Sequence, residues 1–255
     1  MAFKSDLNGG KPLLGTFIKT PHPHVVEVLS QSPFDCLCLD AEHAPFDRSD
    51  LDSCIFAARA AGMPVLVRPA ANAPHEILNA LDCGADGILV PHIRSAADAR
   101  TLAASAHYGP GGGIPRRGYA GSSRAARYGG VSIADHLKAS RDRTVVIAQI
   151  EDVEALDEID EIAQVEGIDA LFVGRIDLTI ALGCTSPKDA PVLQAVDAIV
   201  AAARAAGRAV GMFTSDLAEL PEWRSKGASL FLLASDHGFL RSGAEDLRKL
   251  FLGGK

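Results

Sequence analysis

Polar residues directly follow several short apolar runs of the sequence, and two of them are carboxylates that could share a cation. Glu151 ends the stretch Gln149–Glu151, and Asp177 ends the later stretch Gly174-Arg175-Ile176-Asp177. If the two apolar runs are neighbouring parallel strands, both carboxylates lie at the same edge of the sheet and repel each other unless a cation separates them. A hard divalent ion held by few carboxylates keeps positions open for water and substrate oxygens.

A second interpretation of these two carboxylates is equally open on spacing alone. Glu151, beside Asp152, could stabilise the positive N-terminal end of the helix that follows it. Asp177 could be the N-cap residue of the next helix. The spacing does not choose between a metal site and two helix caps.

A histidine and an arginine at other strand exits could move a proton and bind an anion. His43 follows Glu42 directly and lies three residues after Asp40. A carboxylate that fixes the tautomer of an imidazole makes a base that works near neutral pH, although a lone loop histidine can also be a surface residue. Arg68 ends the run Pro64–Val67, where a half-buried guanidinium needs an anionic partner, either a structural carboxylate or a substrate oxyanion.

Eight short, mostly unbroken apolar runs supply the strands that would position these residues. Unbroken runs are typical of parallel strands buried on both faces. Helix-like segments lie between them, for example 51–61, 96–106, 153–163, 192–206 and 217–226. This alternation predicts an α/β fold, a (β/α)8 TIM barrel that forms one domain over residues 1–255. An open doubly wound sheet is the alternative, but no GxGxxG motif follows the first run. The predicted strands are 13–18, 36–39, 64–67, 87–90, 144–150, 170–173, 209–213 and 229–233.

The composition is that of a globular protein and disfavours two classes of partner. Hydrophobic residues make up 47% of the 255 residues, charged residues make up 22%, and the net charge is −7. Nucleic-acid binding needs clustered positive charge, so we expect no nucleic-acid partner. No apolar run approaches the roughly 20 residues of a membrane span, and the N-terminus has no apolar signal segment. We therefore expect a cytoplasmic protein with no membrane partner and with five reduced cysteines.

One long glycine-rich segment, residues 109–130, interrupts the alternation between the fourth and fifth strands. It carries Arg116, Arg117, Arg124 and Arg127. A loop of this length in a compact domain is usually functional or mobile. It is either a solvated loop, or a lid or subunit contact that handles an anionic substrate.

The sequence resembles the HpcH/HpaI family of metal-dependent class II aldolases over essentially its whole length. Within the family it is similar to the 4-hydroxy-2-oxo-heptanedioate and 2-keto-3-deoxy-sugar-acid aldolases. No single motif carries this resemblance, but their combination is specific. The motifs are Leu39-Asp-Ala-Glu-His-Ala-Pro45, Val67-Arg-Pro69, Gly87-Ile-Leu-Val-Pro91, Gln149-Ile-Glu151 and Phe172-Val-Gly-Arg-Ile-Asp-Leu178.

The resemblance implies a divalent ion, Mg, Mn or Co, with Glu151 and Asp177 as its ligands. The ion would chelate pyruvate or another 2-oxo acid and stabilise the pyruvate enolate formed by C–C cleavage. Arg68 would point at the enolate oxygen, and Gln149 would hold substrate or water. His43, paired with Asp40, would move the proton of the aldol hydroxyl.

The resemblance also implies how the rest of the substrate is bound. The backbone N–H groups of Gly174, Arg175, Ile176 and Asp177 would receive the pyruvate carboxylate at a helix start. Asp82 would reach the site of a neighbouring subunit, because members of the family are commonly homo-oligomers such as hexamers. The chain departs from the family's Gly-Pro-Ala-Asp at Arg175 and Ile176, which would change the pocket wall, and this leaves the aldehyde unassigned.

Three functions therefore remain to be distinguished. The first is reversible aldol cleavage of a 4-hydroxy-2-oxo acid to pyruvate and an aldehyde. The second is a lyase like the citrate-lyase β subunit, acting on an acyl-CoA thioester. The third is a non-catalytic barrel that binds a 2-oxo acid. A class I mechanism would need a Schiff-base lysine at a strand end, and Lys19 is the sole candidate.

Overall fold

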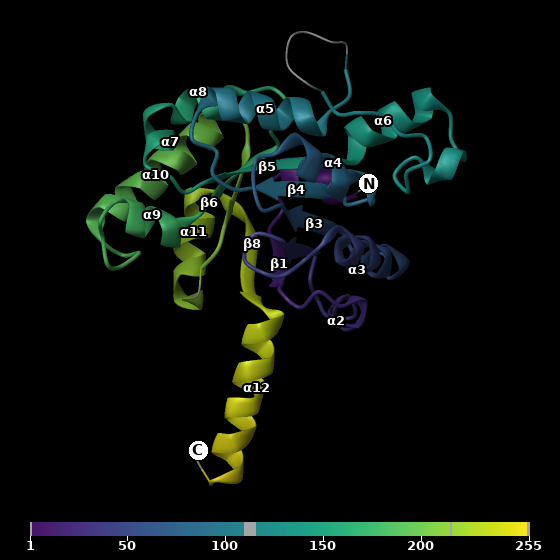
Figure 1. Ribbon diagram of the computed structural model, residues 1–255. Coiled ribbons are helices and arrows are strands. Elements are labelled where there is room, and N and C mark those ends of the chain that lie inside the picture. Colours follow the sequence, from purple (N-terminus) through teal and green to yellow (C-terminus); the bar gives the residue numbers. More distant parts are fainter. Residues whose placement is uncertain (1, 110–115, 215, 254–255) are drawn as a thin grey trace.

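Eight parallel strands close into a barrel in the order in which they occur in the sequence. The computed structural model describes residues 2–109, 116–214 and 216–253. Each strand pairs with its sequence neighbours, and β8 pairs with β1 (Figure 1). The predicted (β/α)8 barrel is confirmed, and each predicted strand lies within two residues of an observed one. The strands are β1 Leu13–Ile18, β2 Cys36–Asp40, β3 Val65–Arg68, β4 Gly87–Val90, β5 Val145–Ile150, β6 Ala170–Val173, β7 Ala209–Met212 and β8 Ala228–Ser235.

Helices cover the outside of the barrel and close one of its ends. The predicted helix 96–106 is observed as α5, whereas the stretch predicted at 153–163 forms two short helices, α7 and α8. The α-helices are α1 Ala2–Asn8, α2 Pro23–Leu29, α3 Arg48–Ala60, α4 Pro74–Asp82, α5 Ala96–Ala106, α6 Ile133–Arg143, α7 Glu154–Asp157, α8 Ile159–Gln164, α9 Arg175–Ala181, α10 Ala190–Ala205, α11 Leu220–Lys226 and α12 Asp236–Phe251. Two 3-10 turns, Arg127–Gly129 and Leu217–Glu219, complete the elements.

Two buried apolar clusters hold the barrel together. Large side chains such as Leu66, Leu89 and Phe172 fill the interior, as expected for a packed barrel rather than a pore. Phe3 and Leu7 of α1 join this interior cluster, so α1 closes the N-terminal end of the barrel. The opposite end, where the strands finish, is therefore the end at which polar side chains can meet a substrate.

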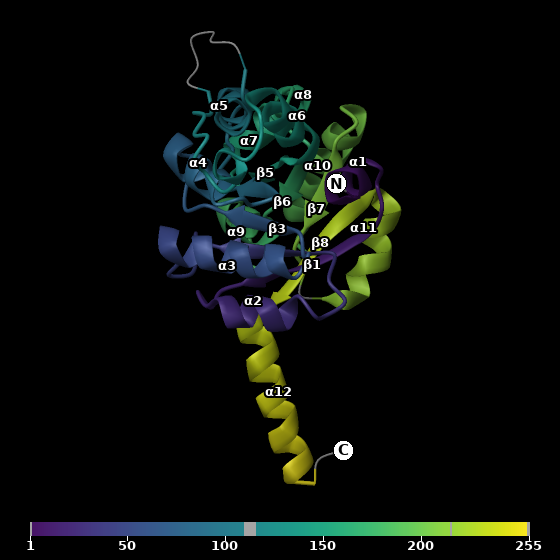
Figure 2. The same cartoon turned by 90° about the vertical axis from the view of Figure 1, so that its right-hand side faces the viewer.

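The last helix, α12, packs against the barrel through its first turn, where Phe239 stacks on Phe34. Figures 1 and 2 show it extending away from the barrel as a separate rod. Several of its apolar side chains are exposed to solvent, among them Leu240, Leu247, Leu250 and Phe251. No helix in the described ranges is long and apolar enough to cross a membrane.

Candidate active site

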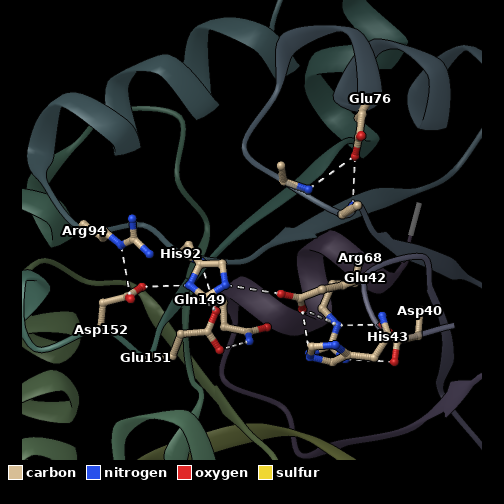
Figure 3. Close-up of polar contacts among 12 residues, drawn as sticks. Asp40, Glu42, His43, Arg68, Glu76, His92, Arg94, Gln149, Glu151 and Asp152 are labelled. Carbon is tan, nitrogen blue, oxygen red and sulfur yellow. Dashed lines mark hydrogen bonds and ion pairs between the residues drawn. The ribbon is translucent and has the colours of Figure 1, made fainter. Parts of the chain in front are cut away.

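Side chains from four consecutive strand exits converge at the C-terminal end of the barrel. Asp40 and Glu42 follow β2, Arg68 ends β3, His92 follows β4 and Glu151 follows β5. Figure 3 shows them in one polar network with Gln149 and His43. Parallel strands bring their carboxyl ends to one edge, which is why residues far apart in sequence meet here.

The centre of this network is a buried ion pair between Asp40 and Arg68. Arg68 donates from Nε to Asp40 Oδ1 at 3.0 Å and from Nη2 to Oδ2 at 2.8 Å. Lys19 Nζ lies 2.9 Å from the same carboxylate, and the Arg68 guanidinium lies over the ring of Phe17. Burial raises the pKa of Asp40, but the hydrogen bonds and charge of Arg68 outweigh it, so the pKa is below its ordinary value. The sequence left a structural carboxylate and a substrate oxyanion open as partners of Arg68, and the structure contains the structural carboxylate, Asp40.

The predicted pairing of His43 with Asp40 takes a different form. Asp40 Oδ1 accepts the backbone N–H of His43 at 3.1 Å and therefore fixes the loop rather than the imidazole. The His43 ring is exposed, and its Nε2 lies 3.6 Å from Glu42 Oε2. The side-chain pairing with Asp40 is thus wrong in this structure, because the Asp40 oxygens are occupied by Arg68 and Lys19. Glu42 is the carboxylate beside the imidazole.

Glu151 is buried and held by groups on three sides. Its Oε2 accepts a hydrogen bond from Gln149 Nε2, and its Oε1 accepts the backbone N–H of His92 at 3.0 Å. A Cβ at Gly174 would lie 2.6 Å from both Cβ and Oε2 of Glu151, so only glycine fits there. Glu151 does not cap the following helix, since α7 begins at Glu154 without a side-chain cap.

Glu42, His92 and Glu151 form a group that fits one divalent ion. Each offers a ligand atom, and the three atoms lie within 4.8 Å of one another. Ligand atoms held at about 2.0–2.5 Å from one ion must lie within roughly 5 Å of each other. Glu42 Oε2 and Gln149 Oε1 are buried without a hydrogen-bond partner among the described residues. The pKa of Glu42 is above its ordinary value, because burial raises it more than the positive charges of Arg68 and His43 lower it. A cation here would satisfy the two carboxylates together.

The other predicted metal ligand, Asp177, does not belong to this group. It lies exposed in the first turn of α9, outside the three-residue cluster. It is not an N-cap either, because Gly174 holds that position and α9 has no side-chain cap. Its role as a ligand stays a prediction. The neighbouring Ile176 is exposed as well.

Arg175 is committed to a structural contact. Its Nη2 lies 2.8 Å from Glu219 Oε2, and its guanidinium lies over the ring of Trp223. The side chain is 6% exposed. It is therefore engaged with the wall formed by α11 instead of being free for substrate. Whether the backbone N–H of Arg175 binds the substrate stays a prediction.

Asp82 and the described part of the glycine-rich segment, residues 109 and 116–130, contribute nothing to this site within one chain. Asp82 ends α4, at the N-terminal side of the barrel, and accepts a hydrogen bond from Arg117 Nη2 at 3.0 Å. Arg124 is held by Asp52 at 2.7 Å. Arg116 and Arg127 are exposed, and residues 110–115 lie outside the described residues. Two of the four arginines thus have structural partners, and a role for Asp82 would need a second subunit.

Four residues of the network in Figure 3 escaped prediction from the sequence as site residues: Glu42, His92, Arg94 and Asp152. Each stands within four residues after a predicted strand, which is the signal that marked the others. The contacts of the His92 ring with Glu42 and Asp152 depend on its left-handed backbone, with φ of 56°, and residue spacing does not reveal that conformation.

Comparisons with known proteins agree with the sequence resemblance. The family model of the HpcH/HpaI aldolase/citrate lyase family matches residues 13–242. The chain is 32% identical to the 4-hydroxy-2-oxo-heptane-1,7-dioate aldolase of Salmonella dublin, over 98% of this chain and 94% of that protein. It is 34% identical to the hydroxypyruvate/pyruvate aldolase of Rhizorhabdus wittichii, over 81% of this chain and 80% of that protein. A family member of known structure from Burkholderia cenocepacia superposes with a TM-score of 0.90 at 32% identity, covering 98% of both chains.

Proposed function

This chain belongs to the HpcH/HpaI aldolase/citrate lyase family, and we propose on that basis that it catalyses reversible aldol cleavage of a 4-hydroxy-2-oxo acid to pyruvate and an aldehyde. The observation that carries the proposal is the meeting of the Asp40–Arg68 ion pair with Glu42 and Glu151 at one barrel end. This arrangement combines the fixed guanidinium of Arg68, the carboxylates of Glu42 and Glu151 and the exposed imidazole of His43 in one place. Such a set can bind a 2-oxo acid and move a proton.

A divalent cation is part of the proposal. Glu151 would hold it together with Glu42, which the geometry adds, and Asp177, which the family resemblance adds. Mg, Mn and Co are the candidates. When bound, the ion would supply Lewis-acid polarisation of the 2-oxo acid oxygens.

Arg68 would stabilise the negative charge that develops on the keto oxygen during cleavage. Two of its nitrogens are fixed on Asp40, which holds the guanidinium plane in place before substrate arrives. Among the described residues, Nη1 makes no hydrogen bond, so this N–H group is available to the oxygen. A preoriented donor needs no reorganisation as the charge forms. The buried Gln149 Oε1, which has no partner, would accept a hydrogen bond from the substrate or from water.

His43 would take the proton of the aldol hydroxyl. Its ring is 54% exposed, so the imidazole can exchange this proton with solvent. Glu42 Oε2 lies 3.6 Å from Nε2 and is the carboxylate that would orient the ring. The pyruvate carboxylate would bind at the start of α9, where the first N–H groups of a helix have no intrahelical partner.

We further propose that the protein is a homo-oligomer in which α12 packs against a second copy of the chain. Leu240, Leu247 and Phe251 fall on one side of α12 by helical spacing, and all are at least 69% exposed. An exposed apolar stripe of this kind usually marks an interaction surface. A second subunit would also give Asp82 the only route to an active site.

The test is turnover with a panel of 4-hydroxy-2-oxo acids, with released pyruvate measured by a coupled dehydrogenase assay. We expect metal-dependent release of pyruvate from at least one member of the panel. The same protein is offered acyl-CoA thioesters, whose cleavage would support the acyl-CoA lyase instead. Binding of 2-oxo acids without turnover of any compound would support the non-catalytic barrel. The Arg68→Ala variant should lose most pyruvate proton exchange, and near-normal exchange would show that Arg68 is misassigned.

A further inference from the structure

His92 occupies an unusual backbone position beside the two carboxylates. It follows β4 directly, and its φ of 56° lies in the left-handed region, which only a few per cent of non-glycine residues adopt, histidine, asparagine and aspartate more often than the others. Its backbone N–H donates to Glu151 Oε1 at 3.0 Å. This conformation directs the imidazole across the gap between Glu151 and Glu42, as Figure 3 shows.

One nitrogen of the His92 ring is already used. Nδ1 lies 2.9 Å from Asp152 Oδ2, and Asp152 is itself held by Arg94 Nε at 3.1 Å from its Oδ1. Donation from Nδ1 to Asp152 leaves the lone pair of the neutral ring on Nε2. A carboxylate that orients an imidazole through one nitrogen is the usual support of a histidine that binds a metal through the other.

The second nitrogen faces a carboxylate without forming a normal hydrogen bond to it. Nε2 lies 3.5 Å from Glu42 Oε1, which exceeds the usual N–H···O distance. Two electron-pair donors at this separation suit a common cation between them. Gln149 Oε1 is buried next to Glu151 without a hydrogen-bond partner among the described residues, in a side chain that is 2% exposed. This is an independent sign that the site accepts a bound cation, water or substrate group.

We propose that His92 is a nitrogen ligand, through Nε2, of the divalent cation held by Glu42 and Glu151, with Asp152 and Arg94 as positioning residues. The proposal rests on the cation of the proposed function and adds the ligand that would set its preference. Imidazole binds first-row transition ions such as Mn, Co, Ni or Zn, whereas Mg strongly prefers oxygen. The site would therefore select a transition ion over Mg.

The direct test is pulsed electron paramagnetic resonance of metal-free protein reloaded with Mn(II). We expect the nitrogen hyperfine signal of a directly bound imidazole in the unmodified protein. The signal should vanish in His92→Asn, whose side chain tolerates the left-handed backbone, and in His92→Gly, which tolerates it without any ligand atom. His43→Ala is the matched control, because His43 also lies beside Glu42, and it should retain the signal.

Calorimetric titration supplies a second readout on the same proteins. The His92 variants should bind Co(II) at least about 10-fold more weakly while their affinity for Mg(II) changes less, and Asp152→Asn should weaken Co(II) binding by about 10-fold. Circular dichroism verifies that each variant is folded. The proposal is overturned if the unmodified protein binds no Mn(II), binds it without nitrogen coupling, or if the coupling persists in His92→Gly. Metal-dependent aldol cleavage without nitrogen coupling would support the proposed function and rule out His92 as a ligand. Nitrogen coupling without cleavage of any substrate would support His92 as a ligand and contradict the proposed function.

Discussion

Arg68 and Asp40 face each other at the ends of adjacent strands and form two hydrogen bonds in a buried, two-pronged ion pair. The strand register itself places them opposite each other, because Asp40 of β2 is the partner of Arg68 in β3. The Asp40 side chain is fully buried, and that of Arg68 is 9% exposed. The pair therefore fixes the orientation of the guanidinium at the barrel end.

Asp40→Asn should destabilise the protein strongly. Removal of Asp40 takes both of its hydrogen bonds from the buried guanidinium of Arg68 and leaves Glu42, 3.3 Å from Nε, as the remaining carboxylate beside it. Removal of one partner of a buried ion pair typically costs about 3–5 kcal/mol. Urea denaturation followed by circular dichroism measures the change in the free energy of unfolding. Lys188→Ala is the control, since it breaks a pair with Asp216 that is open to solvent, and it should leave the midpoint nearly unchanged. Equal effects of the two substitutions would show that the buried pair is not a stabilising contact.

The contribution of Asp40 should also depend on pH. The pKa of this carboxyl in the folded protein is below its ordinary value, so the unfolded chain takes up the proton first as the pH falls. The stabilisation is therefore fully present above the unfolded pKa of about 4 and is lost as the pH falls through the lower, folded value. We expect the difference in urea midpoint between the unmodified protein and Asp40→Asn to shrink below about pH 4. A difference that grows with acidification would contradict this assignment.

Gly174→Ala should damage the site while leaving most of the fold in place. The new Cβ would lie 2.6 Å from Glu151 Cβ and Oε2, so the carboxylate must move. A displacement of about 1 Å in a catalytic group can lower the rate by roughly 100-fold. Pyruvate release and calorimetric metal titration measure the two effects. Gly118→Ala has no atom within 4 Å of its new Cβ and should behave as the unmodified protein. Normal metal affinity in Gly174→Ala would exclude Glu151 from the metal site.

The fold was predictable from the sequence, whereas the detailed contacts of the site were only partly so. Unbroken apolar runs identify the strands of a parallel barrel because burial on both faces leaves no other pattern, and the strand exits then identify Asp40, Arg68 and Glu151. Which residue each side chain contacts depends on atomic positions, and the spacing of residues along the sequence does not determine those positions. Asp40 was expected to hold the imidazole of His43, but the register of β2 and β3 gives it to Arg68.

Three further features could not be predicted, for the same reason. Arg175 was expected in the pocket wall, yet the half-buried carboxylate of Glu219 and the ring of Trp223 offer it a better environment. The left-handed backbone of His92 brings its ring to Glu42 and Glu151, and the spacing of residues along the chain does not fix that conformation. The direction of α12 likewise could not be inferred, because an apolar helix stripe predicts burial without naming the surface that buries it.

Leu247→Asp should disrupt the proposed oligomer. The side chain is 69% exposed in the single chain, so a charge there costs little unless a second copy covers it. Light scattering after size-exclusion chromatography should show a multimer for the unmodified protein and a smaller species for the variant. Glu245→Ala, about 140° around the helix from Leu240 at 3.6 residues per turn, should keep the multimer. A monomer in every case would refute the α12 interface.

The central claim, a metal-dependent site for 2-oxo acid chemistry, is tested most directly by proton exchange of pyruvate. The methyl protons of pyruvate exchange with deuterium only if the protein can form the enolate, and nuclear magnetic resonance follows this without knowledge of the aldehyde. After exhaustive chelation we expect the exchange rate to fall at least about 100-fold, because the ion supplies several kcal/mol of charge stabilisation, and to return when Mn(II) is added. Undiminished exchange in the metal-free protein would contradict the account.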